Sequence, residues 1–243
     1  MSKRVILITG GNGGIGISTA RAFLDERPEN SVWLGIHNRR DQADALALTT
    51  PDRCRCLPLN VTSPTDWRTA VDAILAADGR IDVLVNNAGS HKDMLLGTMP
   101  ASTWSEILAA NLDSTFHGCQ AVLPSMISQR WGRIVNVSSL SALLAPAGQT
   151  HYAAAKAGIV ALTQSLAKEV ARIGITVNAV CPGYVDTDSL AHWSEPERKA
   201  AQTRIPMRRF GKPAEIAAVI RFLACEEASY VTGSTIKIDG GVL

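Results

Sequence analysis

The sequence of 243 residues predicts an α/β fold, a single domain in which helices cover both faces of a doubly wound sheet of about seven parallel strands. Three observations support this prediction. Short apolar runs alternate with longer helix-like segments along the whole chain. The apolar runs lack a regular polar alternation, as expected for strands that are covered on both faces. No repeat, linker or low-complexity segment divides residues 1–243, so that range is predicted to be one domain.

The predicted strands are short runs rich in Val, Ile and Leu. In chain order they are residues 5–9, 31–36, 54–59, 81–86, 133–138, 175–180 and 235–239. The predicted helices lie between them, at residues 15–27, 41–48, 65–77, 101–129, 150–173 and 212–224. Because helices and strands alternate, the chain is predicted to be a series of βαβ units.

The longest segment without clear periodicity is residues 184–211. Connections of this length inside a compact domain are usually functional and often form active-site lids. We therefore expect 184–211 to be a lid that covers the substrate. The alternative is one or two short helices that only pack at the edge of the domain.

Composition and charge exclude several classes of protein. The net charge is +2 and no basic run is present, so nucleic acid is not an expected partner. No apolar stretch reaches the roughly 18 residues that a membrane span needs, so no membrane partner is expected and a cytoplasmic location is predicted. No His stands at metal-ligand spacing from the five Cys, so no metal site is expected.

A glycine-rich loop, TGGNGGIG at residues 9–16, follows the first predicted strand and opens the first predicted helix. Gly10, Gly14 and Gly16 would let the backbone turn tightly and approach a pyrophosphate, which the positive end of the next helix can hold. The alternative is a purely structural turn, but such a turn needs fewer than the five glycines found here. The loop therefore predicts a dinucleotide site.

The residues after the second predicted strand indicate which dinucleotide is bound. A carboxylate there would accept from a ribose 2′-hydroxyl and repel a 2′-phosphate. The segment IHNRR, residues 36–40, has no acid, and Arg39 and Arg40 can pair with a phosphate. This favours NADPH over NADH, with a solvated turn as the alternative. Asn60, which directly follows the third predicted strand, could hydrogen-bond the adenine edge.

Tyr152 and Lys156 lie four residues apart in YAAAK, which places both on one face of a helix about one turn apart. The unperturbed pKa of a tyrosine is about 10, and a nearby ammonium favours the phenolate. We therefore expect Lys156 to lower the pKa of Tyr152 and to make it a proton donor near neutral pH. An isolated match of this kind is more often a surface pair.

Six ordered motifs resemble those of the classical short-chain dehydrogenase/reductase family, which has a Rossmann-type fold, and the match covers nearly the whole chain. They are TGxxxGIG at 9–16, NNAG at 86–89, AANLDSTF at 109–116, NVSS at 136–139, YAAAK at 152–156 and PG at 182–183. The resemblance also implies a homotetramer, which composition does not indicate.

The resemblance implies a catalytic tetrad of Asn111, Ser139, Tyr152 and Lys156. Tyr152 would donate a proton to the substrate carbonyl as hydride arrives from the nicotinamide. Ser139, chosen over neighbouring serines because it lies 13 residues before Tyr152 as in the family, would hydrogen-bond the same oxygen. Lys156 would hold the nicotinamide ribose, and Asn111 would hold a water that links Lys156 to solvent.

The remaining matches imply the cofactor contacts. Residues 87–89 would pass under the adenine ribose and pyrophosphate, and backbone groups of Val185 would hold the nicotinamide carboxamide. The full set of expected contacts is Gly10, Asn12, Gly14, Ile15, Gly16, Arg39, Arg40, Asn60, Val61, Asn87, Ala88, Gly89, Tyr152, Lys156, Pro182, Gly183, Val185 and Thr187.

Segments 88–96, 148–159, 166–188 and 205–241 are similar to 3-oxoacyl-thioester reductases. The similarity implies NADPH-dependent reduction of a 3-oxoacyl thioester, linked to an acyl-carrier protein or to CoA, to the 3-hydroxyacyl thioester. Gly13 stands where carrier-protein enzymes commonly have an Arg, so Arg39 and Arg40 would take over the 2′-phosphate. One alternative is a reductase or dehydrogenase of a free secondary alcohol, sugar or polyketide ketone. The other is a non-catalytic dinucleotide-binding scaffold.

An acyl-carrier protein is acidic, so its docking should use basic residues near the active-site entrance. Arg130 matches a docking arginine of the carrier-protein enzymes, and Arg172 falls one residue from their second. Lys168 could contribute. The alternative is an ordinary solvated helix end.

Overall fold

The computed structural model describes residues 3–191 and 193–243, and it confirms the predicted fold class. The strands of the described chain form one seven-stranded parallel sheet in the order β3-β2-β1-β4-β5-β6-β7. Residues 1–2 of the predicted domain and residue 192 of the predicted lid lie outside the described residues. In the described part of the chain, no helix is long and apolar enough to cross a membrane.

The strand order explains where ligands can bind. The chain winds outward from β1 through β2 to β3, then returns to β4 beside β1 and winds outward again to β7. Open α/β sheets bind ligands at the carboxyl ends of strands flanking such a reversal. The strands are β1 Val5–Thr9, β2 Ser31–Ile36, β3 Cys54–Pro58, β4 Val83–Asn86, β5 Gly132–Val137, β6 Ile175–Pro182 and β7 Thr235–Ile238.

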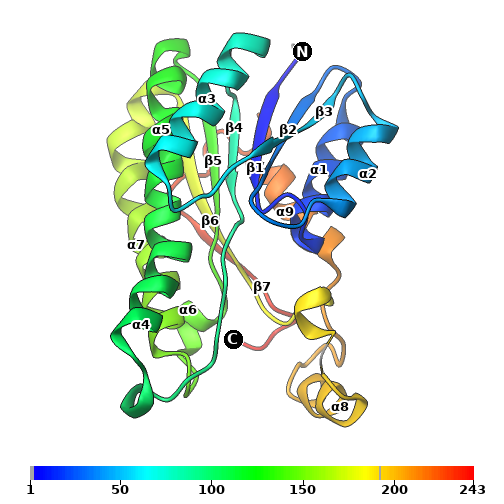
Figure 1. Cartoon of the computed structure of the whole chain (residues 1–243), viewed down its shortest axis with the longest axis vertical. Helices are drawn as coiled ribbons and strands as arrows, with labels where there is room; N and C mark the ends of the chain where they lie inside the picture. Colours follow the sequence, from blue (N-terminus) through cyan, green and yellow to red (C-terminus); the bar gives the residue numbers. More distant parts are fainter. Residues whose placement is uncertain (1–2, 192) are drawn as a thin grey trace.

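Two helical layers cover the sheet (Figure 1). On one face, Phe23 and Ile220 belong to a core cluster formed with α1 Gly14–Glu26, α2 Asp41–Thr49 and α9 Pro213–Leu223. On the other face, Trp67 and Met126 belong to a second cluster formed with α3 Pro64–Asp78, α5 Ser114–Gln129 and α7 Thr150–Val170. Near the carboxyl end of the sheet lie the shorter helices α4 Ala101–Leu108, α6 Ser141–Leu144 and α8 Glu195–Thr203.

The predicted helix at 101–129 is interrupted in the structure. A π-helical turn, Ala109–Asp113, separates α4 from α5. Within this turn Asn111 donates from Nδ2 to the carbonyl of Ile107, four residues earlier, at 2.9 Å. Such turns add one residue to a helical repeat, which apolar periodicity does not reveal, and they occur often at functional sites. The predicted helix at 150–173 ends in a 3₁₀ turn, Ala171–Ile173, and further 3₁₀ turns lie at Leu96–Thr98 and Asp188–Leu190, where no helix was predicted.

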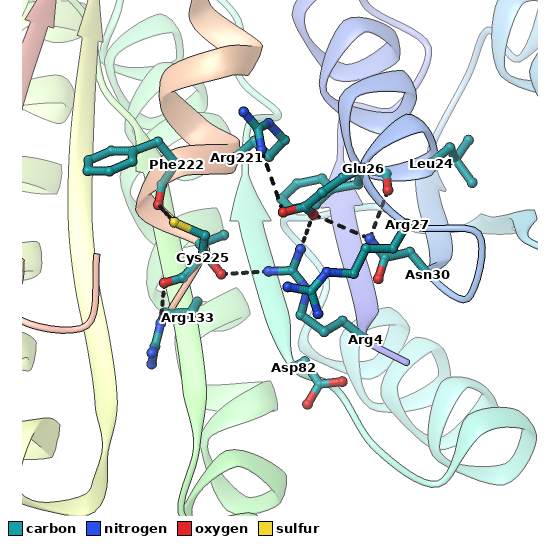
Figure 2. A network of polar contacts seen from close by, with 12 residues as sticks. Arg4, Leu24, Glu26, Arg27, Asn30, Asp82, Arg133, Arg221, Phe222 and Cys225 are labelled. Carbon is teal, nitrogen blue, oxygen red and sulfur yellow. Dashed lines mark hydrogen bonds and ion pairs between the residues drawn. The ribbon is translucent and has the colours of Figure 1, made fainter. Parts of the chain in front are cut away.

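Two buried arginines hold the end of α9 against the amino edge of the sheet (Figure 2). Arg4 donates to the carbonyl oxygen of Ala224 at 2.8 Å and pairs with the Glu26 carboxylate. Arg133 donates from Nε to the carbonyl oxygen of Cys225 at 3.5 Å. The last carbonyls of a helix lack intrahelical partners, so these guanidinium groups satisfy them. The contacts therefore fix α9, whose first turn borders the glycine loop.

We expect Arg4→Ala to lower the free energy of unfolding by about 3 kcal/mol, because it leaves the largely buried Glu26 carboxylate without its main partner. Breaking a buried ion pair typically costs about 3–5 kcal/mol. Glu26 keeps a weaker contact with Arg221 at 3.6 Å, so we expect a loss at the low end of this range. Urea unfolding measures it. The control is Lys3→Ala. The Lys3 side chain is half exposed beside Asp78, so its removal should lower the free energy of unfolding by less than about 1 kcal/mol. Equal small losses in both variants would contradict this account.

Candidate active site

Two adjoining cavities open at the carboxyl end of the sheet. The larger has a volume of about 670 Å³ and the smaller about 390 Å³. They share lining residues and so form one continuous groove. The shared residues are Ile15, Asn87, Gly89 and Thr187. All four predicted tetrad residues line the larger cavity, and the glycine loop lines the smaller one.

The glycine loop is shaped for close approach of a ligand. Gly10 has a positive φ of 63°, which favours glycine, and a Cβ on Gly16 would lie 2.4 Å from the Gly10 carbonyl oxygen. At Gly13 an added Cβ would meet only that same oxygen, at 3.5 Å, so the cavity side is open. The loop leads directly into α1, whose first N–H groups lack helical partners. This open cradle fits the pyrophosphate of a dinucleotide.

Thr9, which the sequence did not single out, ties the two ligand loops together. Its Oγ accepts from the backbone N–H groups of Asn87 at 3.0 Å and Ala88 at 2.9 Å. Asn87 returns a bond from Nδ2 to the Thr9 carbonyl at 2.9 Å. A hydroxyl at the end of β1 was the available signal, since it can bond the backbone of the neighbouring strand's loop. The pair holds both loops in place around the groove.

Asn12 lines the smaller cavity but uses its side chain on α2. Its Oδ1 accepts from the backbone N–H groups of Gln42 at 2.9 Å and Ala43 at 3.0 Å. Its Nδ2 donates to the Asp41 carboxylate at 3.0 Å. Asn12 therefore caps the start of α2 and fixes that helix against the glycine loop.

The two adjacent arginines lie in different surroundings. Arg39 lines the smaller cavity, where its Nη2 is 3.5 Å from the Asp41 carboxylate and 3.8 Å from that of Asp188. Arg40 does not line either cavity and pairs with Asp44 one helical turn away at 2.8 Å. Asp188, in the predicted lid, had no sequence signal because only the fold brings it near Arg39. The structure thus separates the two predicted phosphate ligands.

Among the other predicted cofactor contacts, Asn60, Val61 and Gly16 line neither cavity. Asn60 accepts at Oδ1 from the backbone and side chain of Thr62, which forms a turn. Val61 packs against the core cluster of α3. The predicted contacts that line the groove are Gly10, Asn12, Gly14, Ile15, Arg39, Asn87, Ala88, Gly89, Tyr152, Lys156, Pro182, Gly183, Val185 and Thr187.

Tyr152 and Lys156 lie one turn apart on α7, with Lys156 Nζ 5.6 Å from the centre of the Tyr152 ring. Lys156 is buried and donates from Nζ to the Val137 carbonyl at 2.9 Å. Burial lowers the pKa of Lys156 to about 8. Burial also raises the pKa of Tyr152. The Ser139 hydroxyl acts to lower this pKa, but burial has the larger effect. The expected fall in the Tyr152 pKa is therefore wrong for this structure, because desolvation disfavours the phenolate and Lys156 bonds elsewhere.

Three serines line the larger cavity together with Tyr152, and their hydroxyls have different hydrogen-bond partners. Ser138 is buried and donates from Oγ to the Lys156 carbonyl at 2.8 Å. Ser141 donates from Oγ to Gln149 Oε1 at 2.8 Å. Ser139 accepts from the Ser141 backbone N–H at 3.1 Å, and its hydroxyl acts to lower the pKa of Tyr152. This geometry supports the choice of Ser139.

Asn111 is fully buried, and its amide is only half satisfied. Nδ2 donates to the carbonyl of Ser90 at 2.8 Å and to that of Ile107, whereas Oδ1 has no hydrogen-bond partner among the described residues. A Cβ on Gly89 would lie 2.5 Å from this Oδ1 and 3.4 Å from Lys156 Nζ. Gly89 thus keeps an acceptor and an ammonium open to the same space, which a bridging water fits.

Backbone hydrogen bonds join the two ends of the predicted lid, 184–211. The Gly211 N–H donates to the Tyr184 carbonyl at 2.9 Å, and the Asp186 N–H donates to the Gly211 carbonyl at 2.8 Å. Between these ends, Tyr184, Trp193 and Phe210 pack ring against ring. Tyr184 and Trp193 also line the larger cavity. The segment also contains the short helix α8.

The predicted docking residues are exposed, and within one subunit they lie far from the entrance of the groove. Arg130 ends α5, and Lys168 and Arg172 lie at the end of α7, at the amino edge of the sheet. A Cβ on Gly174 would lie 2.7 Å from the Arg130 carbonyl oxygen, so the two helix ends are neighbours. Because both helices run antiparallel to the strands, their ends point away from the carboxyl edge where the cavities open (Figure 1).

Several polar residues of the larger cavity were not predicted. They are Ser90, His91, Lys92, Asp93, Ser141 and Gln149. They come from the loop after β4 and from the segment around α6, which only the fold brings together. Among the described residues, no group of three or more His, Cys, Asp or Glu could hold a metal ion.

The sequence is similar to those of known proteins along nearly its whole length. The family model described as "Enoyl-(Acyl carrier protein) reductase" matches residues 10–243. The chain is 43% identical to "3-oxoacyl-[acyl-carrier-protein] reductase FabG" of Thermotoga maritima, over 100% of this chain and 99% of that protein. It is 41% identical to the protein of the same name in Vibrio cholerae, over 100% and 98%. It is 38% identical to "Nodulation protein G" of Azospirillum brasilense, over 100% and 99%.

These matches extend over nearly the full length of this chain and of each relative. The six sequence motifs all contribute residues to a single groove. The tetrad, the glycine loop and the strand order come together as one site. The chain therefore belongs to the short-chain dehydrogenase/reductase family, whose members are oxidoreductases that use a nicotinamide dinucleotide.

Proposed function

We propose that this chain is an NADPH-dependent reductase that converts a 3-oxoacyl thioester, linked to an acyl-carrier protein or to CoA, to the 3-hydroxyacyl thioester. The observation that carries the proposal is the joining of the tetrad cavity to the glycine-loop cavity in one groove. The names of the FabG relatives support the substrate class. When bound, the dinucleotide supplies the hydride.

In this proposal Tyr152 is the acid. Its raised pKa keeps the phenol protonated at neutral pH, so it can give its proton to the carbonyl oxygen that becomes the hydroxyl. The Ser139 oxygen already accepts from the Ser141 N–H, and its own proton can bond the same carbonyl oxygen. Together the two side chains fix the carbonyl and stabilise the charge that develops on it.

Lys156 and Asn111 restore the acid. With a pKa of about 8, Lys156 is mostly charged at neutral pH, and its charge favours the phenolate that forms after proton transfer. Asn111 Oδ1 can accept from a water that also accepts from Lys156 Nζ. This gives a proton from solvent a route through the water to Lys156, and from there to Tyr152.

We infer that the lid, 184–211, covers the acyl thioester. Its Leu190 and Trp193 line the larger cavity, as do Leu144 and Pro146, and these side chains supply apolar surface in the cavity that holds the tetrad. A cavity lined by both polar and apolar side chains suits a substrate with a reactive carbonyl and an acyl chain.

A NADPH preference is supported by the position of Arg39 in the smaller cavity. We expect Arg39→Ala to weaken NADPH binding about tenfold and NADH binding far less, because a charge-assisted bond to the 2′-phosphate is lost. Arg40→Ala is the matched control, since Arg40 lies outside the groove and pairs with Asp44. It should change either affinity by less than about threefold. Fluorescence titration with both dinucleotides measures this, and equal losses for NADPH and NADH in Arg39→Ala would remove the assignment.

Steady-state kinetics with a substrate panel test the function. The panel holds acetoacetyl-CoA, a 3-oxoacyl-carrier thioester, an enoyl thioester and free ketones, each with NADPH and with NADH. The proposal expects the 3-oxoacyl thioesters to have the highest kcat/KM. Far higher values for free ketones would favour the alternative of a free-alcohol or sugar reductase, and tight NADPH binding without reduction would favour a scaffold.

We also propose a cytoplasmic homotetramer. Phe116 and Ile127, both on α5, are large apolar side chains that are nearly half exposed, which suits a face covered by another subunit. Sedimentation velocity tests the assembly, and a monomer at micromolar concentration would contradict it.

A further inference from the structure

A chain of hydrogen bonds runs along the larger cavity and ends at Ser139. Gln149 Nε2 donates to Asp93 Oδ1 at 3.0 Å, and Ser141 Oγ donates to Gln149 Oε1 at 2.8 Å. The Ser141 N–H then donates to Ser139 Oγ at 3.1 Å. All four residues line the cavity. The proposed mechanism gives no role to Asp93 or Gln149.

These hydrogen bonds join three segments that are distant in sequence. Asp93 lies in the loop after β4, Ser141 begins α6, and Gln149 directly precedes α7. A backbone bond from the Met94 N–H to the Gly148 carbonyl at 2.8 Å holds the same loops together. The polar chain therefore connects the start of the catalytic helix to the segment that carries Ser139.

Asp93 determines which group donates and which accepts in each side-chain hydrogen bond between Asp93, Gln149 and Ser141. An ionised carboxylate only accepts, so Gln149 must turn its NH₂ group toward Asp93 and its oxygen toward Ser141. The Ser141 hydroxyl is then obliged to donate to Gln149. This fixes Ser141, whose N–H bonds one side of the Ser139 oxygen and leaves the Ser139 proton for the cavity.

We propose that Asp93, acting through Gln149 and Ser141, is a positioning residue that orients the Ser139 hydroxyl for the reduction. This inference rests on the proposed function of the site. Without the carboxylate, the Gln149 amide can rotate, and Ser141 loses the partner that holds it. The Ser139 hydroxyl then spends less time where it can bond the substrate carbonyl.

The negative charge of Asp93 also affects the pKa of Tyr152. Burial is the main cause of the raised Tyr152 pKa, and the Asp93 carboxylate raises it further. The titratable groups around the phenol come from four segments. They are Lys156 on α7, His91, Lys92 and Asp93 in the loop after β4, Cys181 on β6 and Tyr184 in the lid. Since a negative charge disfavours the phenolate, removing it lowers the pKa of Tyr152.

Three variants separate position from charge. Asp93→Ala removes both the acceptor and the charge, Asp93→Asn keeps an acceptor oxygen without the charge, and Gln149→Ala breaks the chain and keeps the charge. We expect kcat to fall about tenfold in Asp93→Ala and Gln149→Ala with little change in KM. It should recover only in part in Asp93→Asn, because an Asn oxygen can accept from Gln149 but its NH₂ group also permits the reverse orientation. The control Asp72→Asn changes an exposed acid on α3 and should change nothing.

The ionisation of Tyr152 gives a readout that needs no turnover. It is followed by phenolate absorbance, taken as the difference between each protein and the same protein carrying Tyr152→Phe. We expect the transition to move to lower pH in Asp93→Ala and Asp93→Asn and to stay in place in Gln149→Ala. A merely structural role for Asp93 would not give this pattern.

Wild-type kcat in Asp93→Ala and Gln149→Ala would overturn the positioning role, and so would a failure of Asp93→Asn to recover activity. An unmoved Tyr152 transition in both Asp93 variants would overturn the electrostatic role. If the wild-type protein reduced no 3-oxoacyl thioester, the proposed function would fail at that step. The absorbance titration would still report on Asp93 and Tyr152 in that case.

Discussion

Tyr152→Phe is expected to lower kcat for carbonyl reduction by roughly a hundredfold to ten-thousandfold, the usual contribution of a positioned general acid. The substitution removes only the phenolic hydroxyl, so the ring keeps its place on α7 beside Lys156 and near His91. Dinucleotide affinity should change little, because the glycine loop and Arg39 are untouched. Stopped-flow and steady-state assays measure the loss.

Tyr230→Phe provides the matched control for that experiment. Tyr230 is fully exposed, and it lines neither cavity. The control should therefore keep wild-type kcat and KM. Turnover near the wild-type rate in Tyr152→Phe would refute the proton-donor role.

Lys156→Met is expected to have two opposite effects, a large loss of activity and a gain in stability. Burial moves the pKa of Lys156 from 10.5 to about 8, so holding the charged form costs roughly 3 kcal/mol near neutral pH. Met has a similar length and no charge to desolvate, so it removes that cost. The free energy of unfolding at pH 7 should rise by up to about 3 kcal/mol.

The gain from Lys156→Met should depend on pH with a definite sign. Between about pH 8 and 10.5 the unfolded wild-type chain binds more protons at this lysine than the folded chain, so wild-type stability rises with pH. The difference between the two proteins should therefore shrink above pH 8. Urea unfolding at pH 7 and pH 10 measures it. Lys168→Met, at an exposed position on the same helix, should stay within about 0.5 kcal/mol of wild type.

A destabilised Lys156→Met protein, or a gain that is the same at both pH values, would contradict the assigned cost of the buried charge. The two expected effects together describe a residue kept for function at the expense of stability. Such a trade is common where a catalytic group must be held away from water.

Much of the site was predictable from the sequence because each motif ends a strand or begins a helix. The loop after β1, residues 86–89 after β4 and residues 182–183 at the end of β6 meet at one edge of any parallel sheet. Tyr152 and Lys156 share a helix face by spacing alone. The alternation of apolar and helical segments was enough to place these elements correctly.

What the sequence could not predict depends on distant segments. The sign of the Tyr152 pKa shift depends on burial by loops that spacing does not reveal. The different surroundings of Arg39 and Arg40 depend on Asp188 and on the position of the α2 helix. The link from Asp93 to Ser139 needs three loops in contact. Local patterns identify the reacting groups, whereas tertiary contacts set their protonation and orientation.

The central claim is that the Tyr152 cavity reduces a 3-oxoacyl thioester at the expense of NADPH. The most direct measurement follows NADPH oxidation with a 3-oxoacyl thioester and identifies the product by mass spectrometry. We predict one equivalent of 3-hydroxyacyl thioester for each NADPH consumed. No hydroxyacyl product with either the CoA or the carrier-protein thioester, from a protein that binds NADPH, would contradict it.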